Sequence, residues 1–183
     1  MQVTIGGVEA PLFYGDGGQV NAQVPYELAG VGAASLVVRG RGAAGAPATV
    51  TIAPAQPGIF TVSQTGTGQG VVLDAAGRLV DANNPARPGD VVVIYATGMG
   101  LTNPAAATGA AAPTEPLAHV TTSPTVTIGG QQATVEFAGL APTFAGLYQI
   151  NARVPAGVAA GSSVPLVITQ NGIASNTVTI AVR

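Results

Sequence analysis

The chain has 183 residues and a formal net charge of −2, and only 8% of its residues are charged. A nucleic-acid-binding protein needs a basic face that displaces counterions from phosphates, and six arginines without a lysine do not provide one. The chain has no cysteine, so disulfides and thiolate metal sites are excluded. It shows no secretory signal and no run of about 20 apolar residues, so we expect no membrane insertion.

Three segments of the first half recur in the same order in the second half. They are residues 3–7 with 126–130, residues 19–25 with 149–155, and residues 48–53 with 176–181. Chance similarity between apolar segments does not keep register over such a distance, so the recurrence indicates an internal duplication. We therefore predict two domains, with the first copy in residues 1–85 and the second in residues 86–183.

The chain is interrupted by 26 glycines and 14 prolines, which leaves little room for helices of ordinary length. Between these breaks lie short β-branched runs that predict strands. In chain order they are residues 36–38, 49–52, 70–73, 91–94, 133–137, 166–169 and 177–182. Their spacing predicts an all-β fold of two tandem immunoglobulin-like β-sandwich domains. Residues 74–77 and 171–172 are expected to form hairpin turns.

The two copies differ at their beginnings. A strand-like run, residues 90–97, precedes the second copy, whereas no such run precedes the first. A sandwich without an edge strand leaves backbone groups unpaired and opens its core to water. Three ways of filling the gap are open: residues 59–80 fold back onto the first copy, a strand lies upstream in a longer chain, or a neighbouring molecule donates one. The last would join molecules head to tail into a fibre.

Residues 101–125 consist mainly of proline, alanine, threonine and glycine, and they predict a long exposed loop. One interpretation is a spacer, and the other is a segment that carries O-linked sugars in a secreted protein. The candidate O-glycosylation sites are Thr102, Thr108, Thr114, Thr121, Thr122 and Thr125. The sequence contains no Asn-X-Ser/Thr acceptor for N-linked sugars.

The sequence shows no constellation for catalysis, cofactor binding or metal binding. His119 is the only histidine, and one imidazole without cysteine or clustered carboxylates does not fill a zinc site. Asp74, Asp81, Asn83 and Asn84 lie close together, but they lack the spacing of a calcium loop and suit turns. We therefore expect no enzyme activity and assign no catalytic, cofactor or metal residue.

Most of the eight aromatic residues lie in or beside strand runs, where we expect them to anchor the cores. Tyr14, Tyr26 and Phe144 lie near glycine or proline instead. These three are the candidates for a face that binds carbohydrate.

Motifs at residues 85–100, 126–130, 137–142, 146–151 and 175–180, with 57–61 in the middle, cover nearly the whole chain. They resemble a C-terminal domain family of secreted acidobacterial proteins of the Solibacter type, which brings no known activity with it. Residues 86–183 are also similar to the IPT/TIG immunoglobulin-like domain, through segments 86–90, 98–100 and 154–157. That resemblance implies an immunoglobulin-like sandwich used as a spacer, a dimerisation surface or an adhesive module. Residues 101–125 are longer than the corresponding connection in that family.

These features predict a non-enzymatic structural or adhesion module that is extracellular or lies at a bacterial cell surface. In its sharper form the hypothesis is a protomer of a filament, assembled head to tail by β-strand contacts. The alternative is a carbohydrate-binding or spacer module of a secreted multidomain protein. The expected partners are further copies of the chain, other surface proteins or a polysaccharide, with no cofactor.

Overall fold

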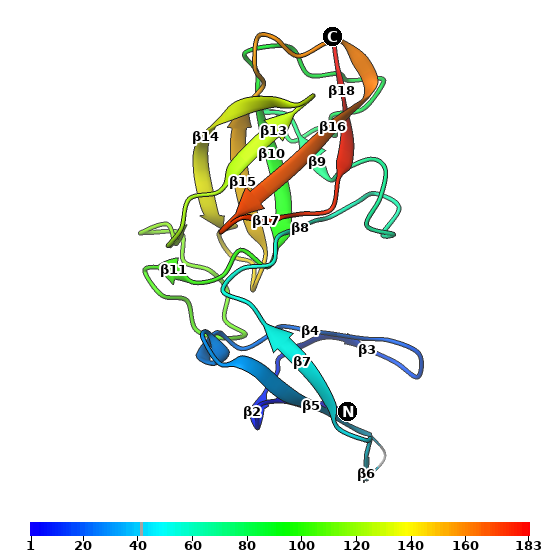
Figure 1. The fold of residues 1–183 in the computed structure, drawn as a ribbon, viewed down its shortest axis with the longest axis vertical. Coiled ribbons are helices and arrows are strands. Elements are labelled where there is room, and N and C mark those ends of the chain that lie inside the picture. The colour runs from blue at the N-terminus through cyan, green and yellow to red at the C-terminus, as the bar shows by residue number, and fades with distance from the viewer. Residues whose placement is uncertain (41) are drawn as a thin grey trace.

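The computed structural model describes residues 1–40 and 42–183, which contain eighteen β-strands and one short 3-10 helix. The predicted all-β class is confirmed. The strands form two units that lie end to end along the long axis of the molecule (Figure 1). The N-terminus lies in the smaller unit and the C-terminus at the far end of the larger one. Within the described residues, no helix has the length and apolarity needed to cross a membrane.

The first unit consists of a five-stranded sheet and a two-stranded hairpin. The sheet contains β1 (Gln2–Ile5), β2 (Val8–Glu9), β5 (Gly32–Gly40), β6 (Ala43–Ala44) and β7 (Ala48–Ile52). The hairpin contains β3 (Leu12–Gly15) and β4 (Val20–Ala22), and the 3-10 helix η1 (Tyr26–Leu28) follows it. The fully buried core of this unit is small and consists of Val3, Ile5, Ala10, Leu28 and Ala34.

The second unit is a β-sandwich with a larger core. Its main strand order is β17 (Ile173–Ala174), β16 (Gly161–Gln170), β13 (Thr125–Ile128), β14 (Gln131–Leu140), β15 (Tyr148–Arg153), β10 (Val91–Thr97) and β8 (Gly58–Ile59). In addition, β9 (Val72–Leu73) pairs with β10, β18 (Val178–Val182) pairs with β16, and β11 (Thr102–Asn103) pairs with β12 (His119–Val120). Strand β14 pairs with β13 up to Ala133 and with β15 from Thr134 onward, and its register with β15 shifts between Val135 and Phe137.

The two copies pair their strands in the same register. In the first unit β1 pairs with β5 through Val3 and Val38, and in the second β13 pairs with β16 through the corresponding Val126 and Ile168. Both copies also have an irregularity at the same place, between Leu12 and Tyr14 in β3 and between Val135 and Phe137 in β14. The repeated sequence segments therefore build the same local structure twice.

One sequence difference breaks a strand in the first copy. The long strand β14 runs without interruption through Thr134, whereas its counterpart in the first copy is split into β2 and β3. Pro11 stands at the split, at the position that corresponds to Thr134. Proline has no backbone N–H for a strand ladder, so the chain separates into two short strands there.

Residues 59–80 belong to the second unit, which rules out the first of the three alternatives, that they fold back onto the first copy. Ile59 and Leu73 pair with β10, and Ile59, Val72 and Val80 lie in the core of the second unit. Gly70 also donates its N–H to Thr179 O on β18 at 3.0 Å. The segment thus closes the side of the second sandwich between β10 and β18. The change from one unit to the other therefore lies near residues 53–57, well before the boundary expected at residue 85.

Residues 101–125 pack against the second unit, which corrects the prediction that they form a long exposed loop. The buried Ala112 and Ala118 contribute to the core of the second unit. Ala118 O accepts a hydrogen bond from Leu140 N at 2.9 Å, and Ala112 N donates to Phe144 O at 2.9 Å. Small alanine side chains allow this close approach of two backbones.

Both predicted hairpin turns are present. Asn171 and Gly172 have positive φ, as the turn between β16 and β17 requires. In the other turn, the carboxylate of Asp74 accepts hydrogen bonds from the backbone and side chain of Arg78 and from the side chain of Asn84. The bonds from Arg78 N and Asn84 hold the pKa of Asp74 well below its usual range. Its oxygens are thus used within the turn.

Candidate functional site: the open side of the first unit

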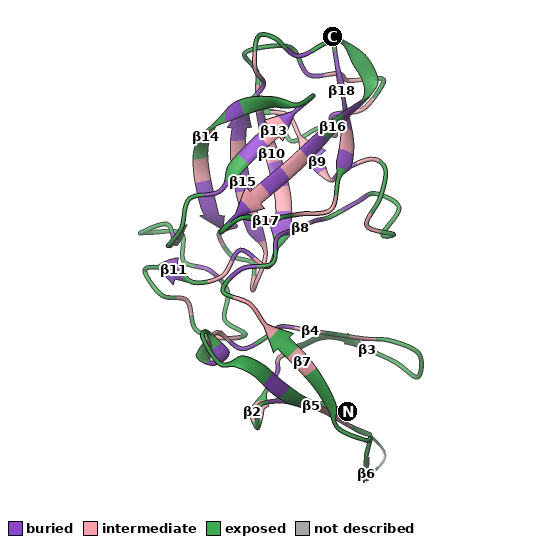
Figure 2. Cartoon of the chain, viewed as in Figure 1, coloured by how far each residue is buried: buried purple, intermediate pink, exposed green. Residues whose placement is uncertain are grey.

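The first unit lacks cover on one side that the second unit has. The strands of the first unit are mostly exposed or half-buried, whereas those of the second unit carry many more buried residues (Figure 2). Half-buried side chains on that side of the first unit correspond in register to fully buried ones of the second unit. The pairs are Leu36 with Leu166, Val38 with Ile168, Val50 with Ile180, and Val20 with Ile150. In the second unit, β10, β9 and Val80 complete the core on this side. No element of the described chain takes their place in the first unit.

The opposite end of the first unit is as well buried as its counterpart. Val3 and Ile5 are 3% exposed, and the corresponding Val126 and Ile128 are fully buried. Leu28 from η1 closes this end, as Val158 does in the second unit. The first unit therefore has a buried core, and one side of that core is exposed to solvent.

The open side is bordered by the free edge of β4. Strand β4 is the counterpart of β15, which pairs with β14 on one edge and with β10 on the other. Among the described residues, β4 pairs only with β3. Val154, just after β15, exchanges two backbone hydrogen bonds with Gly89 and Asp90, at 2.8 and 2.9 Å. Its counterpart Val24 is 48% exposed, against 1% for Val154, and has no such backbone partner in the described chain.

The orientation of the β4 peptide groups follows from its hydrogen bonds to β3. Gln23 N donates to Pro11 O, and Gln19 O accepts from Asp16 N, both at 2.9 Å. In an antiparallel strand the N–H and C=O of one residue point to the same edge, and those of the next residue point to the opposite edge. The N–H and C=O groups of Val20 and Ala22 therefore point to the free edge. Unpaired edge groups of this kind are templates for another strand.

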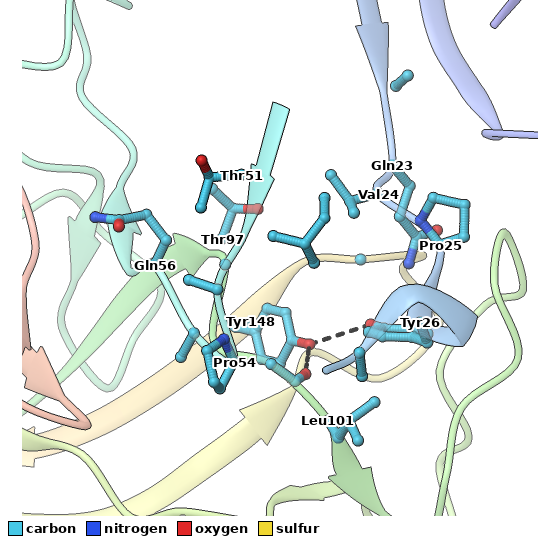
Figure 3. Close-up of a pocket in the computed structure, with 18 of the residues that line it drawn as sticks. Gln23, Val24, Pro25, Tyr26, Thr51, Pro54, Gln56, Thr97, Leu101 and Tyr148 are labelled. Carbon is cyan, nitrogen blue, oxygen red and sulfur yellow. Dashed lines mark hydrogen bonds between the residues drawn. The ribbon is translucent and has the colours of Figure 1, made fainter. Parts of the chain in front are cut away.

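A cleft of about 270 Å³ lies at the end of this open side, between the two units. Its walls come from Val24 and Ile52 of the first unit, Pro54 of the linker, and Leu101 and Tyr148 of the second (Figure 3). Most of this lining is apolar. The cleft and the free edge of β4 are continuous, because Ala22, Gln23 and Val24 also line it.

Two tyrosines join the units at the floor of the cleft (Figure 3). The hydroxyl of Tyr148 donates to Gly100 O, and the hydroxyl of Tyr26 lies 3.2 Å from it. Because Tyr148 donates to Gly100, Tyr26 is the donor in the bond between the two hydroxyls. Burial raises the pKa of Tyr148 well above its ordinary value.

Threonine and glutamine side chains fix the orientation of the units. Thr108 accepts a hydrogen bond from Tyr26 N at 2.9 Å and donates to a carboxylate oxygen of Glu27 at 2.6 Å. The bond from Thr108 lowers the pKa of Glu27. Gly109 N donates to Oε1 of Gln23 at 2.9 Å. Residues 108–109, within the segment predicted to be a long exposed loop, therefore hold the two units together.

The structure does not bring the three candidate carbohydrate-binding aromatics onto one face. Tyr26 lines the cleft, whereas Tyr14 lies on β3 with its hydroxyl bonded to Asp16, and Phe144 lies in an exposed loop of the second unit. The cleft gains a different aromatic, Phe13, which is 56% exposed. Its expected role as a core anchor is wrong. Phe13 lies at the strand irregularity, where its counterpart Glu136 in the second unit is exposed as well, and the strand run alone gave no signal of this.

The candidate O-glycosylation sites fall into two groups. Thr102 is 6% exposed and bonds to Pro104 O, and Thr108 is engaged between the units. A sugar on either would have to displace this packing, so neither fits the expectation of an exposed acceptor. The exposed sites are Thr114, Thr121, Thr122 and Thr125.

The remaining polar candidates do not cluster. His119 is exposed and lies edge-on to the ring of Phe137, with the ring centroids 5.0 Å apart. In the described part of the chain, no group of three histidine or carboxylate side chains is arranged to hold a metal ion.

Comparison with known proteins gives little further information. No protein-family model matches the chain, and no curated protein sequence matches it. Among solved structures, the I9–I11 tandem of titin is similar at 13% identity and a TM-score of 0.28, over 99% of this chain and 54% of the titin chain. The chain thus spans about half the length of that structure. A TM-score of this size supports no argument about family or function.

We expect the change Tyr148→Phe to destabilise the chain by about 1–2 kcal/mol, because Gly100 O and the Tyr26 hydroxyl lose a partner beside a buried ring. The raised pKa of Tyr148 stabilises the folded state fully below the unfolded pKa of about 10, and this stabilisation is lost as the pH rises above it. The free energy of unfolding, measured with urea between pH 8 and about 11, should therefore fall less with rising pH in the variant than in the unchanged chain.

The matched control is Tyr26→Phe, which removes only the bond between the two hydroxyls. It should lower the free energy of unfolding by less, about 0.5–1 kcal/mol. The fall of that free energy at alkaline pH should remain as in the unchanged chain. Equal behaviour of the two variants would contradict the assignment of Tyr148 as the donor to Gly100.

Proposed function

We propose that this chain is a non-enzymatic structural or adhesion module of the extracellular surface, and that it joins neighbouring molecules by β-strand contacts at its first unit. The observation that carries the proposal is the free edge of β4 beside an uncovered apolar side. The second copy fills the equivalent place with its own strand β10. The first copy keeps the register needed for the same contact.

The chemistry of the open side suits a polypeptide. Unpaired N–H and C=O groups alternate along β4, and the half-buried residues behind them are aliphatic. Main-chain hydrogen bonds and alternating side-chain pockets are how a sheet edge binds an extended peptide. The very low charge of the chain also favours a role in association rather than electrostatic steering.

The location is proposed on the sequence alone. The resemblance to secreted acidobacterial domains favours the outside of the cell, as does a surface hydrated by threonine, serine, glutamine and glycine. In the filament form of the proposal, each joint is a strand contact between one molecule and the next. Such a contact is not self-complementary, so it does not close on itself and extends into a fibre.

Sedimentation velocity over a wide range of protein concentrations, with electron microscopy of the same samples, tests the assembly. We expect species that grow with concentration, and linear particles. Ala22→Pro removes one N–H from the free edge and should therefore reduce assembly. The N–H of Ala22 does not bond to β3, so the pairing of β3 with β4 should remain. The control Ala159→Pro changes an exposed loop of the second unit and should assemble normally. A monomer at every concentration would contradict the filament.

A polysaccharide is the second candidate partner, because the aromatic rings of Phe13 and Tyr26 line the same cleft. Binding to a panel of polysaccharides that is lost in Phe13→Ala would support it. Binding that survives this change, or no binding to any polysaccharide, would count against it.

A further inference from the structure

We propose that the free edge of β4 accepts a single extended strand of another polypeptide, antiparallel to β4, with aliphatic β-branched residues at alternate positions. The inference rests on the proposed function, and it names the occupant of the strand contact. The second unit provides the template, because β10 lies antiparallel to β15 in the equivalent place.

The register of the incoming strand can be transferred from the second unit. There Val92 lies opposite Ala152, Ile94 opposite Ile150, and Ala96 opposite Tyr148. The first two correspond to Ala22 and Val20 of β4, and the third corresponds by continuation to Gly18 in the turn before β4. The incoming strand therefore runs from Ala22 towards Gly18.

The side-chain pattern of the occupant follows from the burial of β10. Val92, Ile94 and Ala96 are fully buried and belong to the core of the second unit, whereas Val91, Val93 and Tyr95 are half-buried. The equivalent positions of an incoming strand would face the half-buried aliphatic residues of the first unit. Branched side chains at the first two positions and a small one at the third fit that space.

Only one edge of the occupant takes part in the contact. In β10, Tyr95 N donates to Val71 O at 3.2 Å and Tyr95 O accepts from Phe60 N at 3.1 Å, so the backbone N–H and C=O of Tyr95 face away from β15. The N–H and C=O of Ile94 therefore face β15. In a strand bound to β4, the N–H at the Ile94 position is needed, and the N–H at the Tyr95 position is free.

This difference between the two edges defines the experiment. A fluorescein-labelled peptide with the sequence of residues 87–98, RPGDVVVIYATG, is titrated with the full chain and its anisotropy is measured. We expect saturable binding. N-methylation at the Ile94 position should weaken binding at least about tenfold, and N-methylation at the Tyr95 position should leave it unchanged. The protein is the same in all three titrations, so its folding does not affect the comparison.

Hydrogen exchange gives the location. The bound peptide should slow amide exchange at Val20, Ala22 and Val24, and leave Val3 and Ile5 unchanged. Equal binding of the two N-methylated peptides, or binding of a scrambled peptide as tightly as the parent, would overturn the proposal. Protection elsewhere than β4 would overturn it as well.

The outcomes also separate this inference from the proposed function. Concentration-dependent assembly that is sensitive to Ala22→Pro, without peptide binding, would overturn the β10-like occupant and leave the strand contact between molecules in place. Edge-specific peptide binding by a chain that stays monomeric would support the inference and overturn self-assembly.

Discussion

Replacing Leu166 by alanine is expected to lower the free energy of unfolding of the second unit by about 3–5 kcal/mol, whereas replacing Leu36 should cost the first unit only about 1 kcal/mol. The two leucines hold corresponding register positions, opposite Ile128 and Ile5. Leu166 is fully buried, and Leu36 is half-buried on the open side. The cavity left by Leu166 has no solvent to fill it, while the space at Leu36 is already open to water.

Urea unfolding of each variant, at a concentration where sedimentation shows monomers, measures the difference. Val126→Ala and Val3→Ala form the control pair, because both residues are buried in their units. These two changes should have similar costs, about 1–3 kcal/mol each. If Leu36→Ala lowered the free energy of unfolding as much as Leu166→Ala does in the monomer, the open side would be covered in solution. The proposed strand contact at the free edge of β4 would then be wrong.

The second large effect is expected from Gly98→Ala, at the joint between the units. Gly98 has a φ of +73°, and a Cβ atom added there would lie 2.0 Å from Gln56 O. That oxygen belongs to the backbone of the linker, so the linker itself must move. The hydrogen bond from Gln56 N to Gly98 O, at 2.8 Å, would be lost as well. We expect a loss of at least about 3 kcal/mol.

Gly172→Ala is the matched control. Gly172 has a φ of +77°, and a Cβ atom added there meets nothing within 4 Å. Its cost should be limited to the left-handed backbone, about 1 kcal/mol. Urea unfolding gives both values, and small-angle scattering should show a changed angle between the units for Gly98→Ala alone. Similar losses in both variants would contradict the role of Gly98 in seating the linker.

The fold was largely predictable where local pattern decides it. β-branched alternation located the main strands, and Asn171-Gly172 located a hairpin, because both signals depend on neighbours in the sequence. The destination of residues 59–80 was not predictable in this way. The apolar residues around Val72 suit either sandwich, and only their tertiary contacts, such as the pairing of Leu73 with β10, show which one they close. Ala112 and Ala118 were missed because alanine in a proline-rich segment has no periodicity.

The candidate site was predictable only in part. The missing strand followed from comparing the two copies, since residues 90–97 have no counterpart before the first one. The cleft beside it depends on how the units dock, through Thr108, Tyr26 and Tyr148. These residues are far apart in the sequence, and no spacing rule connects them. Phe13 was misjudged for a related reason, because a strand-like run does not tell whether anything covers it.

The linker seated between Gly98 and Gly100 also has a mechanical consequence. Added Cβ atoms at these glycines would lie 2.0 Å from Gln56 O and 2.4 Å from Pro54 O, so the linker fits there without slack. The termini lie towards opposite ends of the long axis (Figure 1), and tension applied to them passes through the small unit, this joint and the large unit in series. The small unit has few buried residues, so we expect it to unfold first under tension. A strand bound along β4 would stabilise this unit against that unfolding.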